Sequence, residues 1–165
     1  MAACLSKARN VVSQRLNLAA ALPKALAELQ ELRAAGVTHA LAVMEDFELY
    51  VSKEQFAAHD ITVLQIRVSD YCAPNAEEID LGVAFIRANV ESGVHVQCKG
   101  GKGRSVVMVL CYLMAKYGWS AERAFEELSR KHRAANLRGF CGLKGQWRAV
   151  KRFERESVWP AVGSR

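Results

Sequence analysis

A strand that runs directly into a glycine-rich loop and then into an apolar helix constrains the fold most strongly. We predict the strand over 94–97, the loop over 98–103 and the helix over 104–117. The helix is apolar nearly all round, which is typical of a helix buried at the centre of a protein. Short strands without polar alternation are buried on both faces, as in parallel sheets covered by helices. We therefore expect an α/β fold with a short, mainly parallel central sheet flanked by helices.

The rest of the chain repeats this alternation of strands and helices. We expect strands over 15–22, 37–44 and 61–68, and helices over 23–35, 52–59, 77–91, 120–132 and 143–156. Between the second strand and the helix at 52–59, residues 45–48 are expected to form a polar loop. A length of 165 residues with 51% hydrophobic and 24% charged residues fits one folded domain with a sizeable core. The longest apolar run, 105–115, is shorter than the roughly 20 residues that cross a bilayer.

The glycine-rich loop has the composition of an anion-binding cradle. Gly100, Gly101 and Gly103 allow tight turns and positive φ angles, so that successive backbone N–H groups can point into one concavity. The N-terminus of the following helix adds its dipole, and Lys99 and Lys102 add positive charge. We therefore expect these five residues to bind phosphate. The segment lacks the G-x-x-x-x-G-K-[ST] pattern of a nucleotide-binding loop.

A cysteine at the first position of the loop changes what a bound phosphate can undergo. The amides and the helix dipole that hold an anion also favour a thiolate, which makes Cys98 a nucleophile aimed at phosphorus. Arg104, six residues later, can hold two phosphate oxygens with its planar guanidinium. Ser105 can donate a hydrogen bond to the sulfur and ease its departure. The sequence therefore predicts a phosphoryl-transfer site; a purely structural cysteine in a glycine turn is the alternative.

The Cys-x5-Arg-Ser spacing at a strand–loop–helix junction resembles the signature of the cysteine-dependent phosphatases, the superfamily of protein tyrosine and dual-specificity phosphatases. The resemblance implies their single-domain fold and a phosphocysteine intermediate, with no metal and no cofactor. The order of further motifs resembles the mitochondrial dual-specificity-like lipid phosphatases, particularly the plant-type members, at residues 32–37, 58–61, 70–74, 83–86, 109–113 and 146–150. That family dephosphorylates phosphatidylglycerophosphate. The loop also resembles that of a phosphoinositide 3-phosphatase, so Lys99 and Lys102 would suit a substrate with more than one negative charge.

The resemblance also implies a general acid on a loop that follows an earlier strand. Asp70 follows the strand over 61–68 and precedes Cys98 by 28 residues. We expect Asp70 to protonate the leaving oxygen and then to activate the hydrolytic water. Asp60 is a competitor, but it lies where that strand begins. The alternative is that Asp70 only caps a turn.

Gln97 departs from the family pattern, which has a histidine immediately before the nucleophile. That histidine orders the loop and helps to keep the sulfur ionised. Glutamine can still donate hydrogen bonds, so we assign Gln97 to loop ordering, although it adds no charge. We expect slower turnover or a higher pH optimum than in the family. Farther along the chain, we expect Gln146 on a plain helix surface. The alternative, which the resemblance to related phosphatases implies, is a glutamine that positions water.

Three hypotheses about function are compatible with these residues. The first is a phosphatase of an anionic phospholipid such as phosphatidylglycerophosphate or a phosphoinositide. The second is a dual-specificity protein phosphatase for phosphotyrosine, phosphoserine and phosphothreonine, which shares every catalytic residue with the first. The third is a module that binds phosphate without efficient hydrolysis, and Gln97 is its only support.

Positive charge is concentrated in two regions of the chain. Residues 130–155 hold nine basic residues and one acidic residue, within a net charge of +6. This indicates an anionic partner, for which we expect peripheral contact with an acidic membrane surface and not with nucleic acid. A solvated helix face is the alternative. Residues 1–27 hold four basic residues and no acid, as in a targeting segment, although 15–22 also fits a first strand.

We divide the chain into an N-terminal segment (1–14), targeting-like or helical, a catalytic domain (15–157) and a C-terminal tail (158–165). Five widely spaced cysteines fit neither a disulfide scaffold nor a zinc site. Free thiols are typical of a reducing intracellular compartment, which we expect to be mitochondrial or cytoplasmic. No oligomeric state is predicted.

Overall fold

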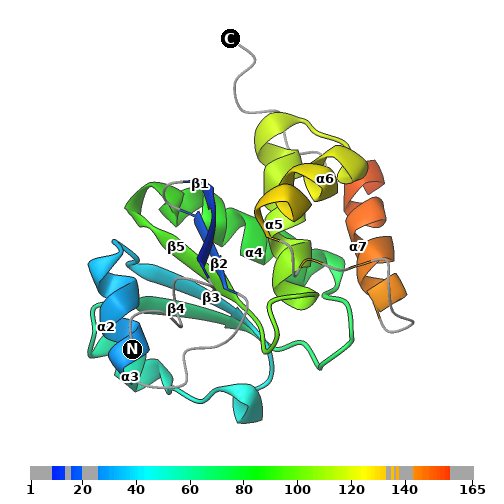
Figure 1. The fold of residues 1–165 in the computed structure, drawn as a ribbon. Coiled ribbons are helices and arrows are strands. Elements are labelled where there is room, and N and C mark those ends of the chain that lie inside the picture. Colours follow the sequence, from blue (N-terminus) through cyan, green and yellow to red (C-terminus); the bar gives the residue numbers. More distant parts are fainter. Residues whose placement is uncertain are drawn as a thin grey trace.

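A five-stranded sheet with the order β1-β2-β5-β3-β4 forms the centre of the computed structural model, which describes residues 9–13, 16–19, 26–132, 135, 137 and 143–156. The strands are β1 (Arg9–Ser13), β2 (Leu16–Ala19), β3 (His39–Val43), β4 (Thr62–Ile66) and β5 (Val94–Gln97). Strand β2 pairs with β5, β5 with β3, and β3 with β4, all in parallel, whereas β1 is antiparallel to β2 (Figure 1). The expected short, mainly parallel sheet is confirmed.

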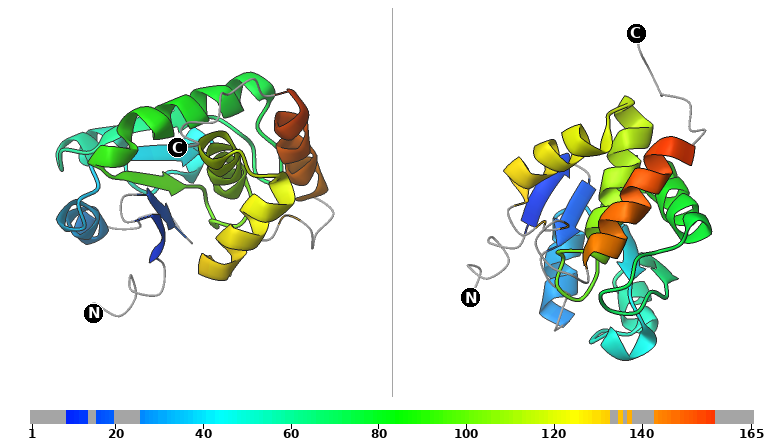
Figure 2. Two further views of the ribbon diagram at one scale, coloured as in Figure 1. Left: turned by 90° about the horizontal axis from the view of Figure 1, so that it is seen from above. Right: turned by 90° about the vertical axis from the view of Figure 1, so that its right-hand side faces the viewer.

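Helices cover both faces of this sheet (Figure 2). In chain order they are α2 (Leu26–Ala34), the 3-10 helix η1 (Asp46–Glu48), α3 (Lys53–Ala57), α4 (Ala76–Asn89), the 3-10 helix η2 (Val90–Ser92), α5 (Arg104–Tyr117), α6 (Ala121–Lys131) and α7 (Leu143–Glu156). Helices α2 and α3 share one apolar cluster with β3, while α4, α5, α6 and α7 form the larger core on the opposite face.

Strand β3 shows why the central strands are apolar without alternation. Leu41 and Val43 lie in the larger core, whereas Ala40 packs on the other face with Leu29 of α2 and Phe56 of α3. A strand covered on both faces is apolar at most of its positions. The sequence pattern and the layered architecture therefore have the same cause.

Helix α5 is the central helix of the larger core, as its sequence predicts. It is buried from Arg104 to Ala115 and packs against α4, α6 and α7. It ends at Gly118, whose positive φ of 64° is a left-handed conformation that glycine adopts without steric strain. The buried first turn of α5 fixes the glycine-rich loop that precedes it.

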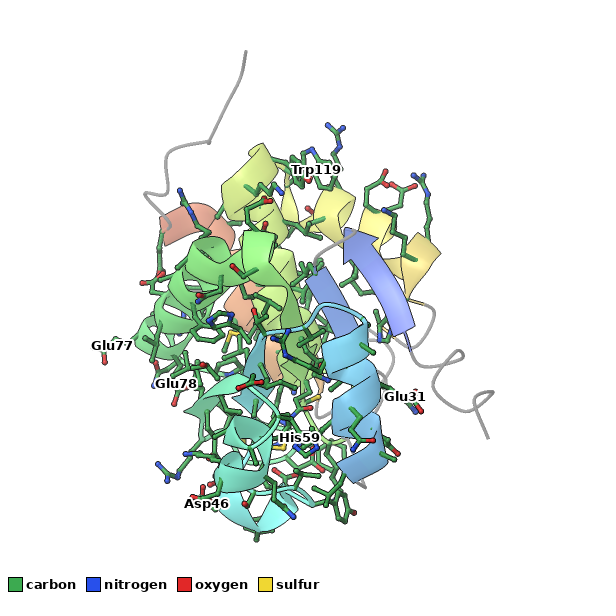
Figure 3. All side chains as sticks on the ribbon, turned by 90° about the vertical axis from the view of Figure 1, so that its left-hand side faces the viewer. Glu31, Asp46, His59, Glu77, Glu78 and Trp119 are labelled. Carbon is green, nitrogen blue, oxygen red and sulfur yellow. The ribbon has the colours of Figure 1, made fainter. Side chains whose placement is uncertain are left out.

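Capping interactions fix where helix α4 begins. At the start of α4, the Asn75 side chain accepts a hydrogen bond from the Glu78 backbone N–H, and the Asn75 N–H donates to the Glu78 carboxylate. This reciprocal pair is a capping box, which anchors the loop before α4. Figure 3 shows Glu77 and Glu78 at the outer surface of this helix.

In the part of the chain that the structure describes, none of the helices is long and apolar enough to cross a membrane.

Two segments differ from the sequence prediction. Residues 9–13 lie in the segment expected before the catalytic domain, but they form β1 and pair with β2. An edge strand can be held by backbone hydrogen bonds to one neighbour, so its sequence needs little hydrophobic pattern. The polar loop expected at 45–48 contains η1. The predicted C-terminal boundary at 157 and the tail lie outside the described residues.

Candidate active site

The carboxyl ends of three neighbouring parallel strands place the predicted residues at one edge of the sheet. Cys98 follows β5, Asp70 lies in the loop after β4, and η1 with Glu48 follows β3. Side chains at the carboxyl ends of parallel strands converge, which is why α/β proteins bind ligands there. Residues that are distant in the sequence therefore meet around one loop.

The glycine-rich loop is tightly folded. Gly101 has a φ of 61°, in the left-handed region that favours glycine. At Gly103, a Cβ atom would collide with the side-chain amide of Gln146, so a larger residue here would require Gln146 to move. Lys99 and Lys102 are exposed at the mouth of the loop, where an anion can reach their ammonium groups.

Cys98 and Ser105 face each other below the loop. The Cys98 Sγ lies 3.2 Å from the Ser105 Oγ, and both side chains are buried. When the sulfur is a thiolate, only the hydroxyl can donate in this pair. Ser105 therefore lies within hydrogen-bond distance of the sulfur.

Arg104 is a buried guanidinium that is held from below by Glu48. Its Nη1 and Nη2 donate to the two Glu48 carboxylate oxygens over 2.6 and 2.9 Å, and Nη1 also donates to the Val68 carbonyl over 2.7 Å. Both side chains of the ion pair are only 2% exposed. The hydrogen bonds from Arg104 lower the pKa of Glu48 below its usual range.

The charges around Arg104 also act on its own protonation. Burial alone lowers the pKa of Arg104, but the hydrogen bonds to Glu48 and the nearby Cys98 and Asp70 raise it above its ordinary value. The guanidinium is therefore a permanent cation. Its position is fixed before any substrate arrives.

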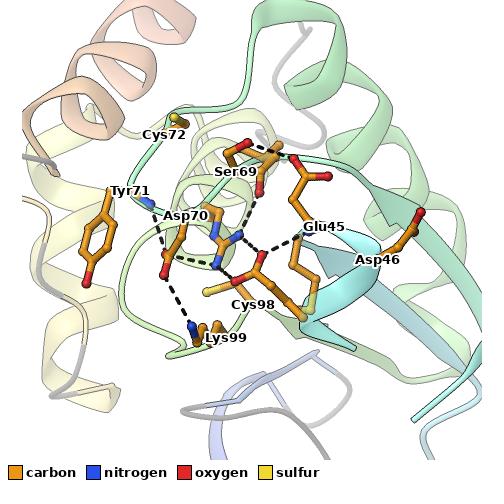
Figure 4. Close-up of polar contacts among 12 residues, drawn as sticks. Glu45, Asp46, Ser69, Asp70, Tyr71, Cys72, Cys98 and Lys99 are labelled. Atoms are coloured by element: carbon orange, nitrogen blue, oxygen red, sulfur yellow. Dashed lines mark hydrogen bonds and ion pairs between the residues drawn. The ribbon is translucent and has the colours of Figure 1, made fainter. Parts of the chain in front are cut away.

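Asp70 lies at the mouth of the same site (Figure 4). Its Oδ1 accepts a hydrogen bond from Arg104 Nη2 over 3.1 Å, and its Oδ2 lies 4.0 Å from Lys99 Nζ. The Asp70 side chain is 41% exposed, in contrast to Glu48. A carboxyl group that is tethered to the arginine but open to solvent can reach a leaving oxygen. Asp60 lies before β4, at the opposite end of that strand.

The loop that carries Asp70 is tied to η1 by polar contacts. The Ser69 hydroxyl donates to Glu45 Oε1 over 2.9 Å, and Arg67 forms an ion pair with Asp46 over 3.0 Å. These contacts join the loop after β4 to the loop after β3. The two carboxylates that reach Arg104 are therefore positioned by connected segments.

Gln97 is buried, and its side chain forms a hydrogen bond within strand β5. Its Oε1 pairs with His95 Nε2 over 3.1 Å, which lies two residues earlier on β5. Its Nε2 is buried without a hydrogen-bond partner among the described residues. The structure therefore places the Gln97 side chain beside His95 and not on a group of the loop.

Gln146 is not on a plain helix surface, so that expectation is wrong. Its side chain is buried, and its Nε2 donates to the Cys72 carbonyl over 2.9 Å. It lies between the loop that carries Asp70 and Gly103 of the glycine-rich loop. The helical pattern of α7 placed the apolar residues inward, but it contained no signal for a buried amide.

Two further polar residues of the site were not predicted. Glu48 lay in the polar loop expected at 45–48, and His132 at the end of α6 was given no role. His132 is fully buried, and its Nε2 lies 2.7 Å from the Gly101 carbonyl oxygen. Each residue reaches the site across a long sequence separation, so no local motif could reveal it.

The described residues contain no group of three or more histidine, cysteine, aspartate or glutamate side chains suited to a metal ion. Cys72, Cys98 and Cys111 are free thiols, and burial raises the pKa of the Cys111 thiol far above its usual value. Cys111 is therefore an inert core residue, whereas Cys98 faces a loop of polar groups. The chemistry available here is that of a thiol nucleophile, an arginine and a carboxylic acid.

This fold and this site define a cysteine-dependent phosphatase domain. A family model described as "Swiss Army Knife protein, DSP-PTPase phosphatase domain" matches residues 6–141. The chain therefore belongs to this family of dual-specificity and protein tyrosine phosphatase domains. The predicted superfamily is confirmed.

Curated relatives and solved structures agree with this assignment. The chain is 31% identical over 134 residues to phosphatidylglycerophosphate phosphatase PTPMT1 of Arabidopsis thaliana, covering 79% of this chain and 38% of the relative. It is 26% identical over 146 residues to the human phosphatidylglycerophosphatase and protein-tyrosine phosphatase 1, covering 84% and 70%. The chain spans less than half the length of the Arabidopsis relatives, PTPMT1 and PTPMT2.

Two crystal structures share the fold. Tk-PTP in the active form has a TM-score of 0.80 and 25% identity, covering 90% of this chain and 97% of that chain. PTPMT1 in complex with PI(5)P has a TM-score of 0.75 and 23% identity, covering 88% and 93%. The expected single-domain phosphatase fold is therefore confirmed.

Proposed function

We propose that this chain hydrolyses phosphate monoesters through a phosphocysteine intermediate on Cys98. The observation that carries the proposal is the convergence of Cys98, Arg104 and Asp70 on one glycine-rich loop at the N-terminus of α5. The loop amides, Lys99 and Lys102 bind the phosphoryl oxygens. Preorganised donors of this kind supply most of the stabilisation in phosphoryl transfer.

In the first step, the Cys98 thiolate attacks phosphorus while the bond to the leaving oxygen breaks. Asp70 donates its proton to that oxygen, so that an alcohol leaves instead of an alkoxide. Arg104 exchanges its contact with Asp70 for phosphoryl oxygens, while its hydrogen bonds to Glu48 keep the guanidinium in place. The product is a phosphorus–sulfur bond.

In the second step, water attacks the phosphocysteine and the phosphorus–sulfur bond breaks. Asp70, now ionised, accepts a proton from the water, which returns it to the acid form. Ser105 donates its hydroxyl proton in a hydrogen bond to the departing sulfur, 3.2 Å away. Inorganic phosphate leaves and the thiolate is restored, so neither a metal nor a cofactor enters the cycle.

The substrate class that we favour is an anionic phospholipid such as phosphatidylglycerophosphate or a phosphoinositide. The names of the Arabidopsis relatives support the first, and the crystal structure of PTPMT1 with PI(5)P supports the second. Lys99 and Lys102 add two exposed positive charges to the loop, which suits a headgroup with more than one negative charge.

A basic groove beside the site supports contact with an acidic membrane surface. The groove has a volume of about 490 Å³ and lies between the loop at Pro74 and Asn75 and helix α7. Arg148 and Arg155 line it and, within the described ranges, have no ion-pair partner. They lie seven residues apart, close to two helical turns, so both guanidinium groups project from one face of α7.

Vesicle binding tests this membrane contact. The double variant Arg148→Glu/Arg155→Glu should bind phosphatidylglycerol vesicles at least about tenfold more weakly, because each basic group contributes about 1 kcal/mol near an anionic surface. Its turnover of a soluble aryl phosphate should not change. The control Arg33→Glu/Lys53→Glu alters the charge equally, on α2 and α3, and should leave vesicle binding intact. An equal loss of vesicle binding in both double variants would show that binding depends only on net charge and not on this groove.

A protein phosphatase is the second candidate function. The human relative is named both a phosphatidylglycerophosphatase and a protein-tyrosine phosphatase, and mouse Slingshot homolog 1, a protein phosphatase, is 30% identical over 103 residues. Both functions require the same catalytic residues.

We expect a reducing compartment, mitochondrial or cytoplasmic, because the Cys98 thiol must remain reduced.

Substrate profiling separates these candidates. We expect phosphatidylglycerophosphate in mixed micelles to give a higher kcat/KM than a phosphotyrosyl peptide, and an aryl phosphate to be hydrolysed as well. The variant Cys98→Ser should lose all three activities. Faster turnover of the peptide would replace the lipid as substrate, and no phosphate release from any substrate would favour the module that only binds phosphate.

A further inference from the structure

The orientation of one peptide bond in the glycine-rich loop depends on a residue outside it. The Gly101 carbonyl oxygen lies 2.7 Å from Nε2 of His132, at the end of α6, 31 residues later in the chain. A carbonyl oxygen can only accept a hydrogen bond, so Nε2 must carry the proton. The imidazole is completely buried, and this contact is therefore shielded from competition with water.

Fixing this carbonyl also fixes the next backbone N–H. The peptide group between Gly101 and Lys102 is planar and trans, so its C=O and N–H point in opposite directions. Gly101 has a φ of 61° and no side chain, which makes rotation of this peptide sterically easy. A donor on the outer side of the loop would hold the carbonyl outward and the Lys102 N–H inward, towards a bound anion.

His132 is itself held in place by its backbone. Its N–H donates to the Leu128 carbonyl over 2.7 Å, and its carbonyl accepts from the Ala135 N–H over 3.0 Å. Leu128 and Ala135 both belong to the larger core. The imidazole is therefore attached to the packed part of the molecule, whereas the loop at Gly100 has open space around it.

Gln97, the residue expected to order the loop, does not supply this contact. Its Oε1 pairs with His95, and its Nε2 has no hydrogen-bond partner within the described segments. The contact with the Gly101 carbonyl comes instead from His132, at the end of α6. The residue that contacts the loop carbonyl is therefore not the residue that precedes the nucleophile.

We propose that His132 is a positioning residue that holds the Gly101–Lys102 peptide with its N–H turned towards the phosphoryl oxygens. The inference rests on the proposed function in one respect, because it assumes that this loop binds phosphoryl groups. His132 touches no substrate atom. It acts through the loop, by removing the reorientation that an unrestrained peptide would need before it could bind an oxyanion.

Two substitutions test this role in the full chain. Glutamine places its amide nitrogen near the position of the histidine Nε2, whereas the shorter asparagine cannot reach the carbonyl. Relative to wild type, His132→Asn should weaken the binding of tungstate, a phosphate analogue, about tenfold and lower kcat/KM for an aryl phosphate about 100-fold, as loss of an oriented donor does. His132→Gln should remain within about threefold of wild type in both measurements, because it keeps the hydrogen bond.

A stability control separates positioning from a merely structural role. Leu32→Ala removes a buried side chain from the separate cluster under α2, so it should lower the melting temperature but leave tungstate affinity unchanged. Equal tungstate affinities of the asparagine and glutamine variants would overturn the proposal. Tungstate binding without phosphate release by the wild type would refute the proposed function instead, and the two variants would still decide the role of His132.

Discussion

Two carboxylates share the guanidinium of Arg104, and their surroundings differ sharply. Glu48, from the helix after β3, accepts two hydrogen bonds from it and is 2% exposed. Asp70, from the loop after β4, accepts one and is 41% exposed. One guanidinium therefore forms two different ion pairs. The pair with Glu48 is a fixed support, and the pair with Asp70 is a movable contact.

Burial explains this difference. When one partner of a buried ion pair is removed, the other charge stays buried without compensation for its lost hydration. When one partner of an exposed pair leaves, water takes its place at little cost. Glu48 is thus suited to hold the arginine throughout the cycle. In the proposed mechanism, the exposed Asp70 leaves the arginine, carries a proton to the leaving group and returns.

The largest expected effect comes from breaking the buried pair. Glu48→Ala leaves the Arg104 charge buried with fewer partners, so the free energy of unfolding should fall by about 3–5 kcal/mol. Asp70→Ala should change it by less than about 1 kcal/mol, since that pair is partly exposed. Urea unfolding of both variants makes the comparison. Similar losses in the two variants would contradict the assignment of different roles.

Asp70→Asn is expected to affect catalysis and not folding. The asparagine cannot donate a proton to an alkoxide, so kcat for an alkyl phosphate should fall about 100- to 10,000-fold. An aryl phosphate has a better leaving group and should lose less in its first step. Steady-state kinetics with both substrates provide the measurement. Equal losses for the two substrates would argue against Asp70 as the acid.

Acid titration of stability should distinguish Glu48 from its neighbour Asp46. The folded state lowers the pKa of Glu48 below its ordinary value of 4.5. Its stabilisation is therefore complete above the unfolded pKa and is lost as the pH falls through the lower, folded value. Glu48→Gln should reduce the slope of stability against pH below about pH 4.5.

Asp46→Asn is the matched control, because Asp46 lies in the same 3-10 helix but pairs with Arg67 at the surface. Its pKa is also lowered, chiefly by the hydrogen bond from Arg67, but the pair is exposed to solvent. We expect a much smaller change in slope. A control variant that changes the slope as much as Glu48→Gln would remove the distinction between buried and exposed carboxylates.

The smallest expected effect is that of Gln97→His. A histidine before the nucleophile adds a positive charge when protonated, which favours the thiolate of Cys98. The rate of alkylation by iodoacetamide follows the fraction of thiolate. At low pH this rate should rise by about three- to tenfold, since moving a titration by one pH unit changes that fraction about tenfold. An unchanged rate profile would show that the position before Cys98 does not act on the sulfur.

The sequence predicted the part of the site that is continuous in the chain. Cys98, the three loop glycines, Arg104 and Ser105 lie within one segment, and their chemistry follows from their spacing between a strand and a helix. Asp70 was placed by resemblance to a family and by its position after a strand. The helices and the parallel strands followed from apolar patterns that a doubly covered sheet requires.

Glu48, Gln146 and His132 could not be predicted in this way. Glu48 lay in an expected polar loop, Gln146 was expected on a helix surface, and nothing in the sequence marked His132. Each is buried because another segment approaches it: Arg104, the Cys72 carbonyl and the Gly101 carbonyl respectively. Strand β1 was missed for a related reason, because backbone pairing at a sheet edge leaves little trace in side-chain pattern. These contacts become visible only when the fold brings distant segments together.

Trapping the intermediate tests the central claim most directly. Asp70→Asn should slow hydrolysis of the phosphocysteine, since the general base is missing, and an aryl phosphate should therefore load the enzyme. Rapid acid quench followed by mass spectrometry of the peptides should then find one phosphoryl group on Cys98. Phosphorylation of another residue, or an unmodified Cys98 during active turnover of the wild type, would contradict the account.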